Sequence, residues 1–568
     1  MCSKISCIGV IVMLLCGADI IVRILIEQGC NTIFGYPGGQ VLDIYHSLHK
    51  YQDEIKHVLT ADEQGAAHAA DGYSRSSGRT GVVLATSGPG ATNLVTGIAT
   101  AYLDSIPMVA ITGNVATSMI GTDSFQELDI TGVTLPITKH NYFVGSIDTL
   151  ADTIREAFRL AVSGRPGPVL VDIPKDIQRQ FCEYTPAPAV KADEPFAAKD
   201  IRISEAAKCI NQSKRPFIFF GGGLVSSGAQ AEMLELAGKI DAALGCSFMG
   251  ISAIPTDYPG FLGMQGMHGR YACSVAMNKA DCVIALGTRF SDRATGGLDT
   301  FIPDAKIVHI DIEGAELSKT TRDTHALRGD IKKTLEALLP LVDKASHPQW
   351  KKQVSDIRAE EEKCKDTREG LTPLNIMETI NRCREADMPV ATDVGQHQMW
   401  SAQMLNFSRE RTFISSGGLG AMGYGMGGAI GSAMATGKKT LLITGDGSFG
   451  MDLNELATVV THQLPITVIL LNKRVLGMVR QLQDFFFDKT YSNTSLENRH
   501  TDFVMLAKAF GADAERVCDV ESFEKALKKA IDGAKPYVIE VMVDKDEYVL
   551  PMIPGGKSVN EIITKVGD

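Results

Sequence analysis

Cysteines at metal-ligand or redox spacing are missing from this sequence. The 12 cysteines are scattered, and no two of them stand three residues apart. This spacing excludes a zinc knuckle or a Cys-x-x-Cys redox motif. Isolated cysteines in a long chain are typical of reduced, buried thiols. We therefore expect a cytoplasmic protein.

Positively charged residues are fewer than negatively charged ones. The 568 residues include 56 Lys and Arg against 67 Asp and Glu, which is a net charge of −11. An acidic chain offers no electrostatic footprint for nucleic acid or for an anionic membrane, so neither is expected as a partner. Hydrophobic residues make up 44% of the chain, and this composition is typical of a globular protein.

Long hydrophobic runs are also absent. The apolar stretch 5–18 resembles a signal peptide, but it is too short for a membrane span of ~20 residues, and Asp19 and Arg23 follow it. We expect residues 1–12 to form an extension and Leu14–Gly29 to form the first helix.

Short apolar runs that alternate with helical patterns are abundant. Such runs, bounded by Gly or Pro, predict parallel strands buried under helices on both faces. The expected class is therefore α/β, with ligands at the carboxyl ends of the strands. The runs are Thr32–Tyr36, Gly81–Thr86, Met108–Thr112, Val169–Ile173, Pro216–Phe220, Cys282–Leu286, Lys306–Ile310, Thr440–Thr444 and Thr467–Leu471.

Two breaks divide this pattern into three doubly wound parallel-sheet domains. Thr185–Lys199 is rich in Pro and Ala, and Lys344–Arg368 is a charge-rich, helix-like spacer. We expect an extension (1–12), a first domain (13–184), a linker (185–200), a central domain (201–343), a second linker (344–372), a third domain (373–550) and a C-terminal flap (551–568).

Three motifs carry chemistry, and each also has a purely structural interpretation. Glu63 stands where a strand passes into a helix, where it could also serve as a helix cap. Asp446 lies between two glycines directly after a buried strand, which suits Mg²⁺ bridging a diphosphate but also an ordinary Asp-Gly turn. Residues 418–423 form a GxGxxG pattern, which indicates either dinucleotide binding or close helix packing.

Taken in order, DEQGAAHAADGYSR (62–75), TSGPGATN (86–93) and GDGSFGMDLNEL (445–456) resemble the thiamine-diphosphate (ThDP) enzymes. Further motifs are similar to the large, catalytic subunit of the acetolactate (acetohydroxyacid) synthase family. These motifs stand at 35–39, 121–127, 139–142, 163–178, 266–272, 287–296, 394–400, 415–425 and 476–479. With this resemblance, which covers about residues 13–555, the GxGxxG pattern no longer indicates NAD.

The resemblance implies the three-domain α/β fold of the ThDP enzymes. In this fold the first domain would bind the pyrimidine of ThDP and the third domain its diphosphate. Glu63 would hydrogen-bond N1′ of the pyrimidine and so help the cofactor take a proton from its own thiazolium C2. Gln126 and Lys175 would lie in active-site segments and complete the catalytic set with Glu63. The ThDP-binding residues would be Glu63, Gln396, His397, Gly420, Met422, Asp446, Gly447, Ser448 and Met478.

The resemblance also implies that the central domain binds FAD, which has no net redox task in this family. Arg289 would in addition bind the carboxylate of the second keto acid, because a guanidinium group can form paired hydrogen bonds with a carboxylate. The FAD-contacting residues would be Arg165, Gly221, Gly222, Gly223, Met267, His268, Gly269, Arg289, Asp292, Arg293, Asp311 and Ile312.

Two positions depart from the family pattern. The family's metal ligand is the second Asn of an Asn-Asn pair, and here the pair is Asn472-Lys473. We expect a weakened Mg²⁺ site held by Asp446, with water or Asn472 as substitute, although the ammonium could instead lie against the diphosphate or Lys473 could point outward. The family's Gln-Trp-Gln is Gln481-Leu482-Gln483, so Leu482 stands where a Trp shapes the pocket for the second substrate.

The expected reaction joins two pyruvates to 2-acetolactate and CO₂, or pyruvate and 2-oxobutyrate to 2-aceto-2-hydroxybutyrate. This is the first common step of branched-chain amino-acid biosynthesis. The alternatives are another ThDP enzyme, such as glyoxylate carboligase or pyruvate oxidase, and a catalytically impaired paralogue. The family further implies a homodimer or homotetramer with the active site at the subunit interface, and leaves open a small regulatory subunit.

Overall fold

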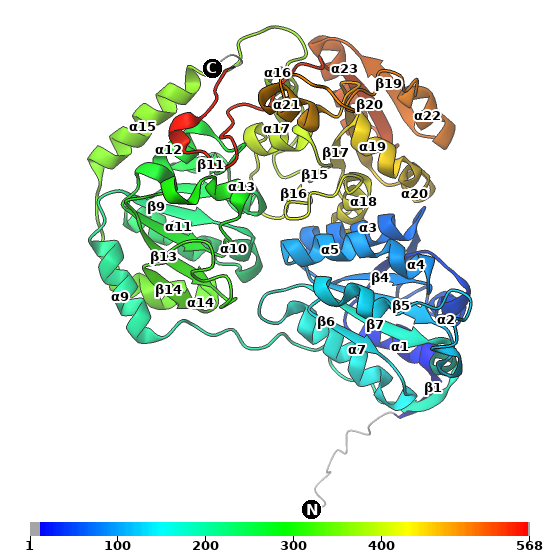
Figure 1. The fold of residues 1–568 in the computed structure, drawn as a ribbon. Helices are drawn as coiled ribbons and strands as arrows, with labels where there is room; N and C mark the ends of the chain where they lie inside the picture. Colours follow the sequence, from blue (N-terminus) through cyan, green and yellow to red (C-terminus); the bar gives the residue numbers. More distant parts are fainter. Residues whose placement is uncertain (1–11, 566–568) are drawn as a thin grey trace, which may run out of the picture. The chain divides into compact units, whose positions relative to one another are not determined.

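The computed structural model describes residues 12–565, so the expected extension 1–12 lies almost entirely outside the described residues (Figure 1). The chain forms two compact units. Of the described residues, one unit contains 12–74 and 79–193, and the other contains 75–78 and 194–565. The first unit holds one six-stranded sheet and the second holds two, and all three have helices on both faces. The predicted α/β class with three parallel sheets is confirmed.

The sheet of the first unit has the strand order β3-β2-β4-β5-β7-β6, and all neighbouring strands are parallel. In Figure 1, α3 and α5 lie on one side of it and α1, α2 and α7 on the other. The strands are β2 (Thr32–Gly35), β3 (Lys56–Leu59), β4 (Gly81–Ala85), β5 (Met108–Asn114), β6 (His140–Phe143) and β7 (Pro168–Pro174). The helices are α1 (Gly17–Glu27), α2 (Leu42–Lys50), α3 (Glu63–Ser77), α4 (Pro89–Asn93), α5 (Val95–Asp104), α6 (Ile130–Thr134), α7 (Ile147–Val162) and α8 (Lys175–Arg179).

The prediction of one helix over Leu14–Gly29 is wrong at its start. Residues Met13–Cys16 form a strand, β1, which pairs antiparallel with β8 (Phe181–Tyr184), and α1 begins only at Gly17. A Cβ at Gly17 would lie 2.2 Å from the carbonyl oxygen of Ile177, so the chain passes close to another backbone there. The partner strand β8 satisfies the backbone polar groups of 13–16, which a helix would otherwise have satisfied internally.

The central sheet lies in the second unit and has the strand order β11-β10-β9-β12-β13-β14. Along β9, Ile218 and Phe220 pack with α9, α11 and α14, whereas Phe217 and Phe219 pack with α12 and α15. Alternate side chains of this strand are thus buried in the hydrophobic cores on opposite faces of the sheet, which explains why the run is apolar throughout. The strands are β9 (Pro216–Phe220), β10 (Ala243–Cys246), β11 (Phe261–Met264), β12 (Cys282–Leu286), β13 (Lys306–Asp311) and β14 (His325–Arg328). The helices are α9 (Asp200–Asn211), α10 (Gly222–Ser227), α11 (Gln230–Lys239), α12 (Tyr271–Lys279), α13 (Asp292–Thr295), α14 (Ile331–Leu338) and α15 (Pro348–Glu362).

The third sheet, also in the second unit, has the order β16-β15-β17-β18-β20-β19. Its central strands, β17 and β18, are buried along their whole length. The strands are β15 (Val390–Thr392), β16 (Phe413–Ile414), β17 (Thr440–Gly445), β18 (Ile466–Asn472), β19 (Asp513–Val517) and β20 (Tyr537–Met542). The helices are α16 (Pro373–Cys383), α17 (Gln396–Met404), α18 (Gly425–Thr436), α19 (Asp446–Asp452), α20 (Leu456–Thr461), α21 (Gly477–Phe486), α22 (Phe503–Phe510) and α23 (Val520–Asp532).

The segments predicted as linkers differ in structure. Residues 185–199 form no helix or strand. The charged spacer instead contains α15, whose Trp350 is buried and donates a hydrogen bond from its indole to the carbonyl oxygen of Pro216 (3.0 Å). Beyond residue 551, Met552 and Ile563 pair as an antiparallel bridge. Among residues 12–565, no helix combines the length and the apolar character that a membrane crossing requires.

Candidate active site

Glu63 is held in a buried position at the start of α3. Its side chain is 9% exposed, and Asn93 Nδ2 donates a hydrogen bond of 3.0 Å to its Oε2. A Cβ at Gly90 would lie 3.0 Å from Glu63 Oε1, so the carboxyl group needs a glycine beside it. The structural alternative, a helix cap, does not account for this residue, because Asp62 Oδ1 accepts the hydrogen bond from the N–H of Gly65 (2.7 Å).

Turns that follow several strands of the same sheet meet beside Glu63. A Cβ at Gly38 would lie 2.4 Å from Thr86 Cγ2, and one at Gly88 would lie 2.9 Å from the carbonyl oxygen of Gln126. Gln126 adopts a φ of 62°, a strained value for a residue with a side chain. Lys175, at the end of β7, donates from Nζ to the carbonyl oxygen of Gly39 (2.6 Å). The carboxyl edge of this sheet therefore brings Gln126 toward the turn next to Glu63 and ties Lys175 to the turn after β2.

In the second unit, Asp446 directly follows β17 and begins α19, as predicted. Burial raises the pKa of Asp446 to about 6, while hydrogen bonds from backbone N–H groups, including those of Lys473, Gly447 and Arg474, oppose the shift. Ser448 donates from Oγ to the carbonyl oxygen of Val394 (2.8 Å). This bond joins the turn after β17 to the loop that precedes α17.

The glycines around this turn let other side chains pack against the backbone, where a Cβ would collide with them. A Cβ at Gly445 would lie 3.0 Å from His397 Nδ1, and a Cβ at Gly477 would lie 2.2 Å from Gln396 Oε1. His397 Nε2 is buried without a hydrogen-bond partner in the described structure, and burial lowers the pKa of this histidine to about 3. An uncharged, buried nitrogen without a partner in the described structure fits a polar ligand that donates a hydrogen bond to it or accepts one from it.

The remaining predicted ThDP contacts border the same turn. Met422 Cε would lie 3.7 Å from a Cβ at Gly447, so the methionine reaches the turn that carries Asp446. Gly420 has a φ of 68°, a conformation that favours glycine. Met478 is half-buried in α21. The structure therefore brings together Gln396, His397, Met422, Asp446, Gly447 and Ser448, which fits a bound ThDP diphosphate.

The two residues after β18 do not form the expected metal site. Asn472 donates from Nδ2 to Glu540 Oε1 (2.7 Å) and accepts the N–H of Arg474 (3.1 Å), so its amide is engaged within the protein. The prediction that Asn472 substitutes as a ligand is therefore not supported. Among residues 12–565, no group of three or more His, Cys, Asp or Glu side chains is placed to hold a metal ion. Of the expected Mg²⁺ ligands, Asp446 remains, beside an amide at 472 that is engaged within the protein and an ammonium at 473 that has no lone pair to offer.

Lys473 points into the protein rather than into solvent. Its side chain is buried, and Nζ donates to Gln396 Oε1 and to the carbonyl oxygen of Glu547, both at 2.6 Å. Nζ also lies 5.4 Å from the ring centre of Trp400. Burial lowers the pKa of Lys473 to about 8, and nearby carboxylates, Glu547 foremost, oppose this shift. The amine is therefore still mainly protonated at neutral pH. The alternative of an outward-pointing lysine is therefore excluded.

The predicted FAD residues of the central domain gather where β9, β11, β12 and β13 end. A Cβ at Gly221 would lie 2.4 Å from the carbonyl oxygen of Gly287, which shows how closely these turns pack. His268 Nδ1 and Gln265 Oε1 are buried without hydrogen-bond partners in the described structure, and burial lowers the pKa of His268 to about 4. These unsatisfied atoms fit a polar ligand at this edge. The other predicted residues on these turns are Gly222, Gly223, Met267, Gly269, Arg289, Asp292, Arg293, Asp311 and Ile312.

Arg165 differs from the rest of this set. It lies in the first unit, where its Nε donates to Ser105 Oγ (2.8 Å). Its assignment to FAD therefore stays a prediction. Asp292 and Arg293 are exposed, in contrast to the buried His268.

Sequence reasoning missed several residues that hold the diphosphate pocket together. Asp393 is fully buried and accepts hydrogen bonds from the N–H groups of Val394 (2.8 Å) and Gly423 (3.0 Å). Gln481 bonds to both polar groups of the Val549 backbone and accepts a bond from Gln396 Nε2 (2.8 Å). An acidic residue at the end of a buried apolar strand could have pointed to Asp393. Nothing local in the sequence distinguishes Gln481 from an exposed helical glutamine.

Known proteins resemble this chain along nearly its whole length. Three family descriptions match it: "Thiamine pyrophosphate enzyme, N-terminal TPP binding domain" at residues 15–133, the central domain at 203–338, and the "C-terminal TPP binding domain" at 393–541. The acetolactate synthase isozyme 2 large subunit of Escherichia coli K12 is 42% identical over 556 residues, which cover 97% of this chain and 100% of that protein. The acetolactate synthase large subunit of Corynebacterium glutamicum is 41% identical, covering 97% and 90%, and the chloroplastic acetolactate synthase of Arabidopsis thaliana is 40% identical, covering 97% and 84%.

Proposed function

The chain belongs to the thiamine pyrophosphate enzymes, in the family of the acetolactate synthase large subunits, and we propose that it catalyses the acetolactate synthase reaction. Two molecules of pyruvate would give 2-acetolactate and CO₂, and pyruvate with 2-oxobutyrate would give 2-aceto-2-hydroxybutyrate. The observation that carries this proposal is the full-length similarity together with the buried Glu63 beside Gly90.

The residues present fit ThDP, and they have separate tasks. Bound ThDP supplies the acceptor for the electron pair that the keto acid leaves when it loses CO₂. Glu63 would hold a proton at N1′ of the pyrimidine, since Asn93 and the missing side chain at Gly90 fix its carboxyl group. Gln396, His397 and the turn 446–448 would orient the diphosphate end. Gln126 and Lys175 would border the substrate, and Arg289 would bind the carboxylate of the second keto acid.

FAD is proposed as a second, structural cofactor. The unsatisfied His268 Nδ1 and Gln265 Oε1 support a polar ligand at the edge of the central sheet. We also retain the cytoplasmic location that the scattered cysteines predict.

One assay tests the proposed function most directly. Acetolactate formation from pyruvate is measured with and without added ThDP, Mg²⁺ and FAD, and the absorbance of the purified protein is recorded for bound flavin. The proposal expects ThDP-dependent acetolactate. Conversion of glyoxylate alone would favour glyoxylate carboligase, and cofactor binding without turnover would favour an impaired paralogue, an alternative that Lys473 motivates.

Partner chains form part of the proposal. A homodimer or homotetramer would place Glu63 of one subunit opposite the Asp446 turn of another. Relatives are named large subunits, so we also expect a small regulatory subunit to join this chain.

Leu482 predicts a changed choice of second substrate. It is half-buried in α21, next to the buried Gln481. A leucine leaves a looser wall against the extra methyl group of 2-oxobutyrate than the family's tryptophan does. Leu482→Trp is therefore expected to raise the preference for 2-oxobutyrate over pyruvate by about 1–3 kcal/mol, the usual worth of one methylene in a fitted pocket.

The measurement is the product ratio when both keto acids compete. The exposed Phe486 of the same helix offers a control variant, Phe486→Trp, which should leave the ratio unchanged. If Leu482→Trp also leaves it unchanged, residue 482 does not line the second-substrate pocket.

A further inference from the structure

Lys473 is a buried cation whose direct partners are all uncharged. Nζ donates to an amide oxygen of Gln396 and to the main-chain carbonyl of Glu547, and it lies over the ring of Trp400. Within residues 12–565, no carboxylate lies within ion-pair distance of this ammonium. Burying a charge without a counter-charge is costly, so such groups are normally paired. The arrangement therefore calls for an anion that binds at this place.

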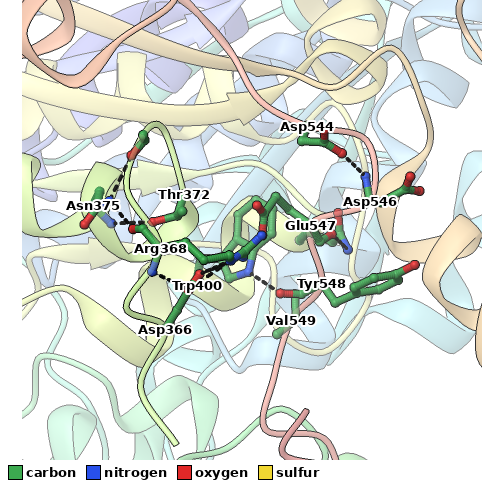
Figure 2. Close-up of polar contacts among 12 residues, drawn as sticks. Asp366, Arg368, Thr372, Asn375, Trp400, Asp544, Asp546, Glu547, Tyr548 and Val549 are labelled. Carbon is green, nitrogen blue, oxygen red and sulfur yellow. Dashed lines mark hydrogen bonds and ion pairs between the residues drawn. The ribbon is translucent and has the colours of Figure 1, made fainter. Parts of the chain in front are cut away.

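Two of the acidic residues near Lys473, Glu547 and Asp546, already pair with arginines. Figure 2 shows Arg368 beside Glu547, and the two side chains form an ion pair of 2.7 Å. Asp546 pairs with Arg480 at 2.6 Å. Because each of these carboxylates has its own guanidinium, neither neutralises Lys473 by direct contact. Carboxylates thus act on Lys473 only from beyond ion-pair distance, and its ammonium can still pair directly with an anionic ligand.

The partners of Lys473 locate that ligand. Gln396 is the first residue of α17, a helix of nine residues, and its side chain lies where a Cβ at Gly477 would stand. The N-terminal end of a helix attracts anions, and the adjacent His397 carries the unsatisfied Nε2. Through Gln396, Lys473 thus lies next to His397 and the turn that carries Asp446, the residues expected to bind the diphosphate.

The groups that would hold a divalent cation in this pocket are engaged elsewhere. Asp446 accepts hydrogen bonds from the backbone N–H groups of Lys473 and Arg474, and Asn472 bonds to Glu540. A protonated lysine has no lone pair to donate to a metal. The turns after β17 and β18 therefore offer few ligands for Mg²⁺, and they place the positive charge of Lys473 beside them.

We propose that Lys473 is a built-in cation that binds the diphosphate of ThDP in place of a divalent metal, so that this chain binds ThDP without Mg²⁺. The inference rests on the proposed ThDP site and deepens it. Lysines bind phosphates as point charges in other proteins. Two of its three N–H donors end on Gln396 and Glu547, which hold the ammonium in place, and the third makes no hydrogen bond within residues 12–565.

ThDP binding, measured apart from turnover, tests this proposal. Metal-free protein is titrated with ThDP by calorimetry in EDTA and again in Mg²⁺, and Mn²⁺ binding is followed by electron paramagnetic resonance with ThDP present. The native chain is expected to have the same Kd in both buffers and to bind no stoichiometric Mn²⁺. These measurements need no variant and hold whether or not a substitution at 473 folds.

Variants sharpen the test. Lys473→Met keeps the length of the side chain without its charge and should weaken ThDP binding in EDTA by about 10–100-fold, the worth of a charge-assisted hydrogen bond. Lys473→Asn should bind ThDP well only when Mg²⁺ is added. Lys545→Asn, which removes an exposed lysine that pairs with Glu497, is the control and should behave like the native chain. Thermal unfolding without ThDP verifies that each variant is folded.

The possible outcomes distinguish a failure of the proposed role of Lys473 from a failure of the proposed ThDP site. Native protein that binds ThDP only with Mg²⁺, or that takes up one Mn²⁺ per ThDP, would overturn the role of Lys473. Native protein that binds no ThDP in either buffer would overturn the ThDP site itself and this proposal with it. Metal-independent binding that Lys473→Met abolishes would support both.

Discussion

Replacing Glu63 with glutamine is expected to lower the rate of acetolactate formation by about 10²–10⁴-fold, the range for a positioned acid–base group. The amide keeps the shape of the side chain and can still contact Asn93, but it cannot exchange a proton with N1′ of the pyrimidine. The loss should appear in kcat, because the site remains able to bind ThDP. Proton exchange at C2 of bound ThDP, followed by NMR, reports the affected step directly.

The variant needs a control that changes the same functional group elsewhere. Glu54 is an exposed glutamate that pairs with Arg23 on the surface of the same unit, and Glu54→Gln should leave both measurements unchanged. Exchange at C2 at the native rate in Glu63→Gln would show that this carboxyl group does not activate the cofactor.

Mixed subunits carrying different inactivating substitutions are expected to regain activity. Glu63→Gln removes the acid, and Asp446→Ala removes the acceptor for the N–H groups of Lys473 and Arg474, so each variant alone should be nearly inactive. If the two residues of one site come from two subunits, a heterodimer holds one doubly substituted site and one intact site. Equal, random mixing should restore about a quarter of native activity, because half of the dimers are then mixed.

Differently tagged subunits, purified in tandem after co-expression, provide dimers of known composition. Pure mixed dimers should reach about half of native activity, since one of two sites is intact. Homodimers of each variant, carried through the same purification, set the background. Proven mixed dimers that stay at this background would show that Glu63 and Asp446 act from the same subunit.

Much of the fold was predictable because its strands are buried on both faces. A strand such as β9 must then be apolar at every position, and a run of this kind bounded by breakers is visible without knowledge of its neighbours. The same logic located Glu63 at the start of α3 and Asp446 at the end of β17. The candidate site residues near strand ends could be found from the local sequence, because the end of a strand is where its apolar run stops.

What the sequence by itself determined, then, is the succession of elements and the residue types at their carboxyl ends. Only the tertiary structure decided which way the side chains after β18 point. Lys473 turns inward because Gln396 and the carbonyl of Glu547, both distant in sequence, offer acceptors there, and Asn472 is turned away by Glu540. Likewise, 13–16 is a strand because β8 lies beside it. Such choices depend on contacts between residues far apart along the chain, and no local pattern contains them.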